Sequence, residues 1–279
     1  MAKADTAGTG YPYQMAADPD HLLVRSTPRR AGEGRGEALR SVNIALDVLE
    51  CFATDNELGV TDIARRLGVA KSTAHRMLSV LGNRGYVEQV PATGRYRLGI
   101  HVYELGQLAQ ARSSLRHVAL PVMRYIAETT GLTVNLSVPD GPDVVFVERI
   151  EKPGLEEELE RIGRRLPAHV TSSGKVIAAF NPAVDRARRE VGFPPRVSRT
   201  VRSVAHWESE LAMARRHGFA TSESESINDV STVAVPIRNV AGLAVAAISM
   251  MGPTGQIRAD IPRLAQLLTT ESRRIGRQL

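Results

Sequence analysis

Residues 70–87, AKSTAHRMLSVLGNRGYV, combine a polar, partly cationic helix face with a regular apolar stripe. The stripe consists of Ala74, Leu78 and Leu81, at spacings i, i+4 and i+7, which is typical of the buried side of a helix. The polar side chains beside it can bind phosphate oxygens and base edges: Lys71, Ser72, Thr73, His75 and Arg76. A solvated amphipathic helix shows the same pattern, so the surrounding sequence must decide between the two interpretations.

The positive charge of the chain is concentrated around this helix. Residues 65–97 hold seven cations and one anion, Glu88, and therefore the whole formal net charge of +6 at pH 7. A basic surface localised in this way favours a polyanionic partner. The cations are Arg65, Arg66, Lys71, Arg76, Arg84, Arg95 and Arg97.

The elements around residues 70–87 predict a winged helix-turn-helix. In the preceding segment, GVTDIARRLG, Thr61 is the expected N-cap of a short helix and Gly68 fits its C-terminal end with a positive φ. Two short helices joined by a tight, glycine-containing turn define a helix-turn-helix, whose second helix lies in the major groove. A turn at 91–94 and the alternation that follows it predict a hairpin, or wing, with Arg95 and Arg97 on its outer face.

We therefore expect double-stranded DNA as the macromolecular partner. The second helix is expected to contact base edges and nearby phosphates, and the two wing arginines to reach the flanking DNA backbone. A winged helix that binds protein is the alternative, and the concentrated charge favours DNA. The predicted DNA-binding residues are Lys71, Ser72, Thr73, His75, Arg76, Arg95 and Arg97.

The chain divides into four predicted segments. They are a disordered tail at 1–36, a DNA-binding domain at 37–99, a linker helix at 100–115 and a second domain at 116–279. The tail is rich in Gly, Ala, Pro, Asp and Arg and lacks hydrophobic periodicity, which is typical of disorder. The second domain is expected to mix two antiparallel hairpins with separate helices, which predicts an α+β fold with an antiparallel sheet. The hairpins are expected at 133–150 and 231–250, and the helices at 172–180, 206–217 and 261–275.

Composition and missing motifs exclude several classes of function. The single cysteine, Cys51, excludes an internal disulfide and argues against a cysteine-based zinc site. The first residues contain no apolar secretory region and the apolar stretch 243–251 is too short to span a bilayer, so we expect a cytoplasmic protein with no membrane partner. Residues 172–175 have the S-x-x-K spacing without the accompanying acyl-transfer motifs, a P-loop lacks its first glycine, and no H-x-x-x-H spacing occurs. We therefore expect no enzymatic activity, no cofactor and no metal ion.

Several stretches of the chain resemble the IclR family of bacterial transcriptional regulators. They are SVNIALDVLECF, then TDIARRLGVAKSTAHRMLSVLGNRGYVEQVPATGRYRLG, then PAHVTSSGKVIAAF with the later GFATSESES, STVAVPI and AAISMMGP. The resemblance covers about residues 38–275 and is strongest over 60–99. It implies an N-terminal winged helix-turn-helix, a linker helix and a GAF-like C-terminal domain that binds a small effector. It also implies a homodimer or tetramer that represses or activates transcription.

The expected effector site lies at the start of the helix predicted from Ser172. Free N–H groups at a helix N-terminus, together with the Ser172 and Ser173 hydroxyls, suit a carboxylate, although these serines can instead serve only to cap the helix. The resemblance places the family's pocket between this helix start, residues 222–225 and the strands that carry Thr232 and Ser249. The predicted effector-binding residues are Ser172, Ser173, Gly174, Glu223, Thr232 and Ser249.

The residues of this region favour one small organic acid with an apolar body as the effector. Glu223 and Glu225 would repel a second carboxylate, while Thr232 and Met251 stand where the family often has cysteine and serine. Two other functions stay open: a ligand-independent architectural DNA-binding protein, and an enzyme or sensor domain fused to a DNA-binding head. The size of the second domain argues against the architectural protein. A small molecule that changes the mobility of the protein–operator complex would separate these functions.

Overall fold

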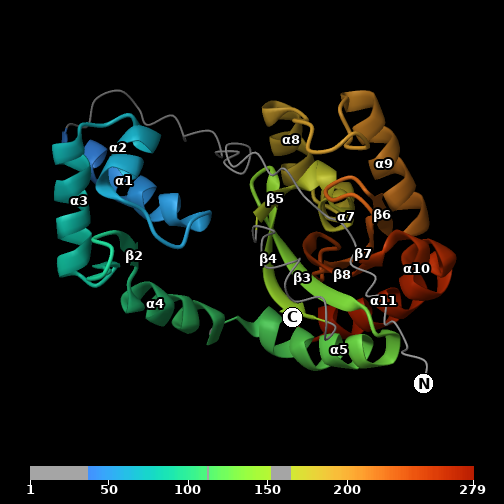
Figure 1. Ribbon diagram of the computed structural model, residues 1–279. Helices are drawn as coiled ribbons and strands as arrows, with labels where there is room; N and C mark the ends of the chain where they lie inside the picture. The colour runs from blue at the N-terminus through green and yellow to red at the C-terminus, as the bar shows by residue number, and fades with distance from the viewer. Residues whose placement is uncertain (1–36, 112, 152–164) are drawn as a thin grey trace, which may run out of the picture.

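The computed structural model describes residues 37–111, 113–151 and 165–279 (Figure 1). Helix α4 (Ile100–Ala111) joins an N-terminal domain to a C-terminal domain. The tail expected at 1–36 lies outside the described residues. No helix in the described ranges is long and apolar enough to cross a membrane.

The N-terminal domain is a winged helix-turn-helix. One apolar core that includes Ile63, Ala74 and Leu78 holds α3 against α2, and Gly68 ends α2 at a φ of 64°, a conformation that favours glycine. The two wing strands pair antiparallel. In chain order the elements are α1 (Glu37–Glu50), a 3₁₀ helix (Cys51–Ala53), α2 (Val60–Leu67), α3 (Lys71–Asn83), β1 (Val87–Gln89) and β2 (Tyr96–Leu98).

Helix α2 begins earlier than the sequence predicts. Its N-cap is Gly59, and the Asp62 carboxylate accepts a hydrogen bond from the Gly59 N–H at 3.2 Å. This acceptor satisfies a free N–H group of the first turn in the manner of a capping box. The prediction of Thr61 as the cap is therefore wrong, because an acidic residue inside the first turn supplies the acceptor instead.

The start of α4 lies directly against the chain that leaves α3. The Gly99 N–H donates to the Tyr86 carbonyl oxygen at 2.9 Å, and the His101 N–H donates to the Gly85 carbonyl oxygen at 3.3 Å. A Cβ at Gly99 would lie 2.2 Å from the Gly85 carbonyl oxygen, so this approach requires glycine. The Tyr86 and His101 rings meet edge to face with centroids 4.9 Å apart. The first turn of α4 therefore packs as part of the N-terminal domain.

The C-terminal domain is built on a six-stranded antiparallel sheet in the order β5-β4-β3-β8-β7-β6. The structure confirms the hairpins expected at 133–150 and 231–250, whereas the sequence analysis did not include β5 and β6. The strands are β3 (Thr133–Asp140), β4 (Asp143–Ile150), β5 (Arg165–Pro167), β6 (Ala220–Glu223), β7 (Val230–Arg238) and β8 (Ala244–Pro253).

Helices cover both faces of this sheet (Figure 1). On one face Val134, Leu136 and Val235 pack against α5 and α11, and on the other Ala234 and Ala247 belong to the core beneath α7, α8 and α9. Because successive side chains of a strand point to opposite faces, these two sets fix which strand residues lie under α7. The helices are α5 (Ser114–Thr130), α7 (Ser172–Phe180), α8 (Pro182–Val191), α9 (Val204–His217), α10 (Thr254–Ala259) and α11 (Ile261–Gly276).

Candidate DNA interface and effector site

The outer face of α3 carries the polar residues that we expect to meet DNA. On the inner side of the helix, Ala74 and Leu78 are fully buried. Thr73 is half-buried. The other expected contacts on this helix are exposed, and they are Lys71, Ser72, His75 and Arg76. The structure therefore presents these side chains together on the surface of one helix.

Two further residues of α3 share this face and are absent from the sequence prediction. Ser79 and Asn83 are exposed and continue the spacing set by Ser72 and Arg76, at i+7 and i+11. The periodicity of the exposed positions could have identified them. The predicted contacts are limited to the N-terminal end of the helix, because this end usually contacts the bases.

Ion pairs divide the seven cations of residues 65–97 into two groups. The paired cations are Arg65, Arg66, Arg95 and Arg97. Within the described ranges, the other three form no ion pair: Lys71, Arg76 and Arg84. These three lie on α3 or directly after it, so the unneutralised positive charge of this region belongs to the recognition helix.

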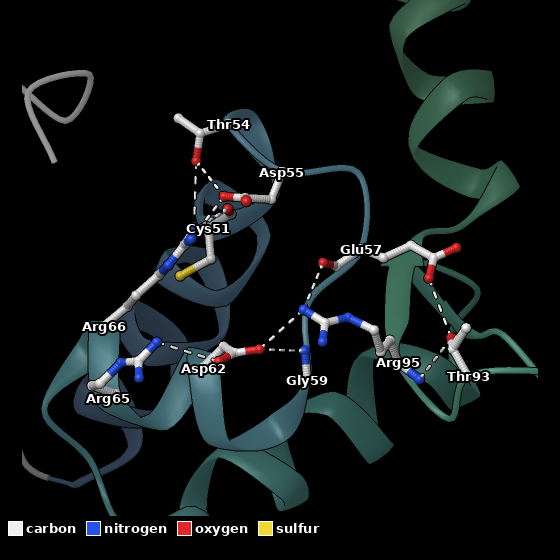
Figure 2. Close-up of polar contacts among 10 residues, drawn as sticks. All are labelled: Cys51, Thr54, Asp55, Glu57, Gly59, Asp62, Arg65, Arg66, Thr93 and Arg95. Atoms are coloured by element: carbon white, nitrogen blue, oxygen red, sulfur yellow. Dashed lines mark hydrogen bonds and ion pairs between the residues drawn. The ribbon is translucent and has the colours of Figure 1, made fainter. Parts of the chain in front are cut away.

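Both wing arginines bind carboxylates of their own domain. The exposed Arg97 pairs with Glu88, which lies directly opposite it on β1. The Arg95 side chain reaches back to the start of α2, where its Nη2 donates to the Asp62 carboxylate at 3.1 Å and to the Glu57 carbonyl oxygen at 3.2 Å (Figure 2). Arg95 thus departs from the expected outward phosphate contact.

A second polar cluster joins α2 to the 3₁₀ helix and to the loop that follows it. The Arg66 Nη1 donates to the Cys51 carbonyl oxygen at 3.2 Å, and its Nη2 lies 2.7 Å from the Asp55 carboxylate (Figure 2). Hydrogen bonds from Arg66 and Thr54 hold the pKa of Asp55 below its usual value. This cluster stabilises the scaffold on which α3 is mounted.

In the C-terminal domain, the start of α7 presents hydroxyls of the predicted effector site. The cap of α7 is Thr171, whose hydroxyl accepts a hydrogen bond from the Gly174 N–H at 2.9 Å. The Ser172 hydroxyl lies 2.6 Å from the Thr232 hydroxyl of β7. The buried Ser173 makes no side-chain hydrogen bond to another residue that the structure describes. The alternative in which Ser172 and Ser173 only cap the helix is therefore wrong, because Thr171 is the cap.

Polar side chains of β3 line the sheet beneath α7. Thr133, Asn135 and Ser137 are buried and alternate with Val134 and Leu136, which pack into the opposite core. The hydroxyls of Thr133 and Ser137 are buried and have no hydrogen-bond partner among the residues that the structure describes. Native proteins leave few buried polar groups unpaired, so this stripe calls for an explanation beyond packing.

The sheet register joins this stripe to the predicted effector residues. Asn135 lies opposite Ser249 of β8, and Met251 lies between Thr133 and Thr232 in the next row. The β3 residues were not predicted as part of the site. Their signal in the sequence is a polar residue at every second position of TVNLSV. Such alternation is also typical of a strand with one solvated face, and only the packing of α7 reveals that this face is covered.

Arg149 of β4 brings a cation to the same face of the sheet. It lies opposite Asn135, and its Nε is 2.6 Å from the Glu151 carboxylate. Within the described part of the chain its buried Nη2 has no hydrogen-bond partner, and burial lowers the pKa of Arg149. A partly buried guanidinium on the same face as these hydroxyls suits an anionic ligand, because a charge-assisted hydrogen bond would satisfy Nη2.

Two predicted effector residues play other parts in the structure. Glu223 belongs to the opposite face of the sheet, where it pairs with Arg258 of α10 at 2.5 Å. Gly174 permits close packing, since a Cβ there would lie 2.2 Å from the Ala168 carbonyl oxygen. The other four predicted residues lie on the α7 side of the sheet.

A buried lysine binds two acidic residues near α7. The Lys175 Nζ lies 2.7 Å from a carboxylate oxygen of both Glu210 and Glu225, and donates to the Thr221 carbonyl oxygen at 3.1 Å. An ammonium group has three donors, so all of them have partners. Burial raises the pKa of Glu225, and the nearby Lys175 charge opposes that rise. Glu225 therefore has a cationic partner, which it shares with Glu210.

The two regions define a class of protein. An exposed recognition helix with unpaired cations, mounted beside a wing, is the arrangement of a DNA-binding domain. The attached α+β domain carries buried, unpaired polar groups suited to a small ligand, and no group of His, Cys, Asp or Glu in the described ranges could hold a metal ion. Together they define a DNA-binding regulator with a ligand-binding domain.

Comparison with known proteins identifies the family. The family model of the IclR helix-turn-helix domain matches residues 41–91, and that of the bacterial transcriptional regulator IclR C-terminal domain matches residues 107–277. The chain therefore belongs to the IclR family of bacterial transcriptional regulators. It has a DNA-binding domain followed by an effector-binding domain.

Similar proteins are named as regulators. The HTH-type transcriptional regulator XynR of Escherichia coli (strain K12) is 33% identical over 222 residues, 78% of this chain and 88% of its own length. The transcriptional repressor IclR of the same strain is 27% identical over 227 residues, 80% of this chain and 83% of its own. The crystal structure of an IclR homolog from Microbacterium hydrocarbonoxydans, complexed with 4-hydroxybenzoate, has a TM-score of 0.73 and 29% identity, covering 86% of this chain and 98% of that chain. The chain is accordingly a transcriptional regulator of this family.

Proposed function

We propose that this chain controls transcription by placing α3 in the major groove of an operator, and that a small organic acid bound between α7 and the sheet alters this binding. The proposed operator binding rests on the positive charge that forms no ion pair with the described residues, on α3 and directly after it. Lys71, Arg76 and Arg84 supply this charge. Cationic side chains at the start of a recognition helix can contact guanine edges and nearby phosphates. Operator binding requires the chain to work in the cytoplasm, beside the chromosome.

We propose that two copies of the chain bind one pseudo-palindromic operator. A single recognition helix reads only a few base pairs, whereas a two-fold dimer places two helices in major grooves about 34 Å apart or a multiple of that distance. Large apolar side chains exposed on α1 and α4 support this arrangement: Val42, Leu46, Ile100, Tyr103 and Leu108.

Replacing Arg76 by alanine is expected to weaken operator binding by about 1–3 kcal/mol, because a guanidinium contact to a base or close phosphate is lost. The operator is obtained by selecting duplexes from a random-sequence pool with the unaltered chain, and the affinity is measured by fluorescence anisotropy. The matched control is Arg124→Ala, which removes an exposed cation from α5 and should keep the unaltered affinity. Full binding by Arg76→Ala together with lost binding by Ser79→Ala would contradict this orientation of α3.

The effector half of the proposal rests on unpaired polar groups between α7 and the sheet. The Thr133 hydroxyl and the Arg149 Nη2 are buried and find no partner in residues 37–111, 113–151 and 165–279, and Ser173 lies at the start of α7. Ligand oxygens, above all a carboxylate, would supply the missing partners. The IclR homolog complexed with 4-hydroxybenzoate supports this class of ligand, because that compound carries one carboxylate on an apolar ring.

The two glutamates that were expected to repel a second carboxylate both have cationic partners. Glu223 pairs with Arg258, and Glu225 shares Lys175 with Glu210, so the expected repulsion is weakened. The preference for one acid group now depends on Met251, a buried apolar side chain in the row between Thr133 and Thr232. Dicarboxylates therefore belong in any screen.

A thermal-shift screen of aromatic, branched-chain and dicarboxylic acids tests the effector site. An effector at 100 times its dissociation constant adds about 2.7 kcal/mol of stability, and the same acid should change operator affinity. We expect Thr232→Val and Ser173→Ala to lose this stabilisation. The control Ser231→Ala should keep it, because the Ser231 hydroxyl bonds Thr254 of α10. Stabilisation that survives both Ser173→Ala and Thr232→Val would contradict the proposed site.

A further inference from the structure

Arg95 connects the wing to the start of α2 (Figure 2). The Arg95 Nη2 donates to the Asp62 carboxylate and to the Glu57 carbonyl oxygen. In the turn before Arg95, the Thr93 hydroxyl donates to the Glu57 carboxylate at 3.2 Å. The Arg95 side chain is partly covered, with 43% of it exposed. The wing turn is therefore attached to the segment that leads into α2.

The Asp62 carboxylate, which binds Arg95, also binds groups of α2 and its N-cap. Asp62 Oδ2 also accepts the hydrogen bond from the Gly59 N–H at 3.2 Å, and Oδ1 lies 3.3 Å from Arg65 Nη2. Asp62 stands in the first turn of α2, where the helix dipole favours a negative charge. One side chain thus begins α2 and holds the wing.

The wing depends on attachments of this kind. Its strands share three residue pairs, from Val87↔Leu98 to Gln89↔Tyr96, and an isolated two-stranded hairpin is marginally stable in water. Leu58 pairs with Tyr96 through two backbone hydrogen bonds of 2.9 Å. The Asp62–Arg95 pair holds the wing at Arg95, one residue closer to its tip than Tyr96, where the bridge lies.

We infer that Arg95 is a positioning residue for DNA binding, whose pair with Asp62 fixes the wing relative to α2 and, through α2, relative to α3. The inference rests on the proposed operator binding and deepens it. Arg97 is then the wing residue that contacts phosphate, because its exposed side chain pairs across the hairpin with Glu88 and not with α2.

The two possible roles of Arg95 predict opposite effects of changing Asp62. If only charge mattered, removing a carboxylate from the DNA-binding domain would strengthen binding, because phosphates repel it. If the pair positions the wing, Asp62→Asn weakens binding. The asparagine oxygen can still accept the Gly59 N–H, so the start of α2 is retained.

The test measures the dissociation constant of the selected operator duplex over a series of salt concentrations. We expect Arg95→Ala and Asp62→Asn each to weaken binding about tenfold, a coupling typical of groups in direct contact, without a change in the slope of log K against log salt. The double variant should bind no more weakly than either single variant. Asp62→Glu keeps a carboxylate at the same helical position and should restore binding.

The matched control is Arg97→Ala, two residues further along the same strand, which should flatten the salt slope by about one unit. A flatter slope for Arg95→Ala would overturn the inference, as would unaltered or stronger binding by Asp62→Asn. Circular dichroism melting separates these effects from unfolding, and if Asp62→Asn melts below the assay temperature the slope of Arg95→Ala decides alone. Failure of the unaltered chain to select any duplex would instead overturn the proposed operator binding.

Discussion

Burial keeps the imidazole of His169 neutral near pH 7. The side chain is fully buried, and its Nε2 lies 2.9 Å from the Pro194 carbonyl oxygen, so this nitrogen carries the proton and donates it. Nδ1 is buried, and no described residue offers it a hydrogen bond. Burial lowers the pKa of His169 from 6.5 to about 4, and the positive charges of Arg188 and Lys175 add to the decrease. Protonation inside the folded domain is therefore unfavourable.

The free energy of unfolding of the C-terminal domain should fall as the pH drops from about 6.5 to about 4. In this interval the unfolded chain binds a proton at His169 and the folded domain does not, which favours unfolding by up to about 3 kcal/mol in total. Below about pH 4 both forms carry the proton and the effect ends. Urea unfolding at a series of pH values, followed by the fluorescence of the buried Trp207, the chain's one tryptophan, measures this dependence.

The matched variants for this measurement are His169→Gln and His117→Gln. The first removes the buried imidazole and should flatten the pH dependence, whereas the second changes an exposed histidine of α5 and should leave it as it is. An identical pH dependence in His169→Gln and the unaltered chain would contradict this account of His169.

The burial or exposure of a single side chain could be predicted where the spacing of its neighbours in the sequence determines which way it points. Apolar residues at i, i+4 and i+7 were sufficient to identify the buried side of α3, and therefore its exposed polar side. The direction of Arg95 could not be predicted, because its partner Asp62 lies 33 residues away and an arginine bound to DNA would show the same alternation. The same holds for Glu223 and its partner Arg258, which are 35 residues apart.

Elements could be predicted where one of their faces is uniformly apolar. This condition holds for α3 and for the β3–β4 and β7–β8 hairpins, and it fails for α8 and β6. In α8 the inward face includes the fully buried Arg188, which lies 3.5 Å from the Asp143 carboxylate, so its periodicity is not that of apolar residues. The strand β6, ATSE, has four residues and only one apolar side chain.

The arrangement of the whole molecule followed from the distribution of charge and from the change of pattern along the chain. Residues 65–97 hold the net charge and lie within the DNA-binding domain, and the hairpins of the second domain begin only beyond α5. The sequence could not separate apolar residues that pack on their own core from those that remain uncovered, because both follow the same helical spacing. The structure leaves 54% of Leu46 on α1 and 62% of Tyr103 on α4 exposed.

Charged substitutions at these uncovered positions are expected to break the proposed dimer. Leu46→Glu or Tyr103→Glu would place a carboxylate in an apolar contact, and each should raise the dimer dissociation constant by about tenfold or more, equivalent to about 1.4 kcal/mol. Sedimentation velocity over a range of concentrations measures the change. Val240→Glu, on the fully exposed β7–β8 turn of the other domain, is the control and should leave association unchanged. A monomeric unaltered chain that protects one asymmetric half-site in footprinting would contradict the two-fold arrangement.

The close approach of Gly99 to Gly85 also determines where the gene of such a protein can be cut and rejoined. Because the first turn of α4 packs on the chain that leaves α3, a crossover at residue 99 would separate groups that depend on each other. A crossover after His101, within the exposed part of α4, keeps them in one piece. An engineered biosensor that attaches another sensory domain to this DNA-binding domain should therefore be joined beyond His101.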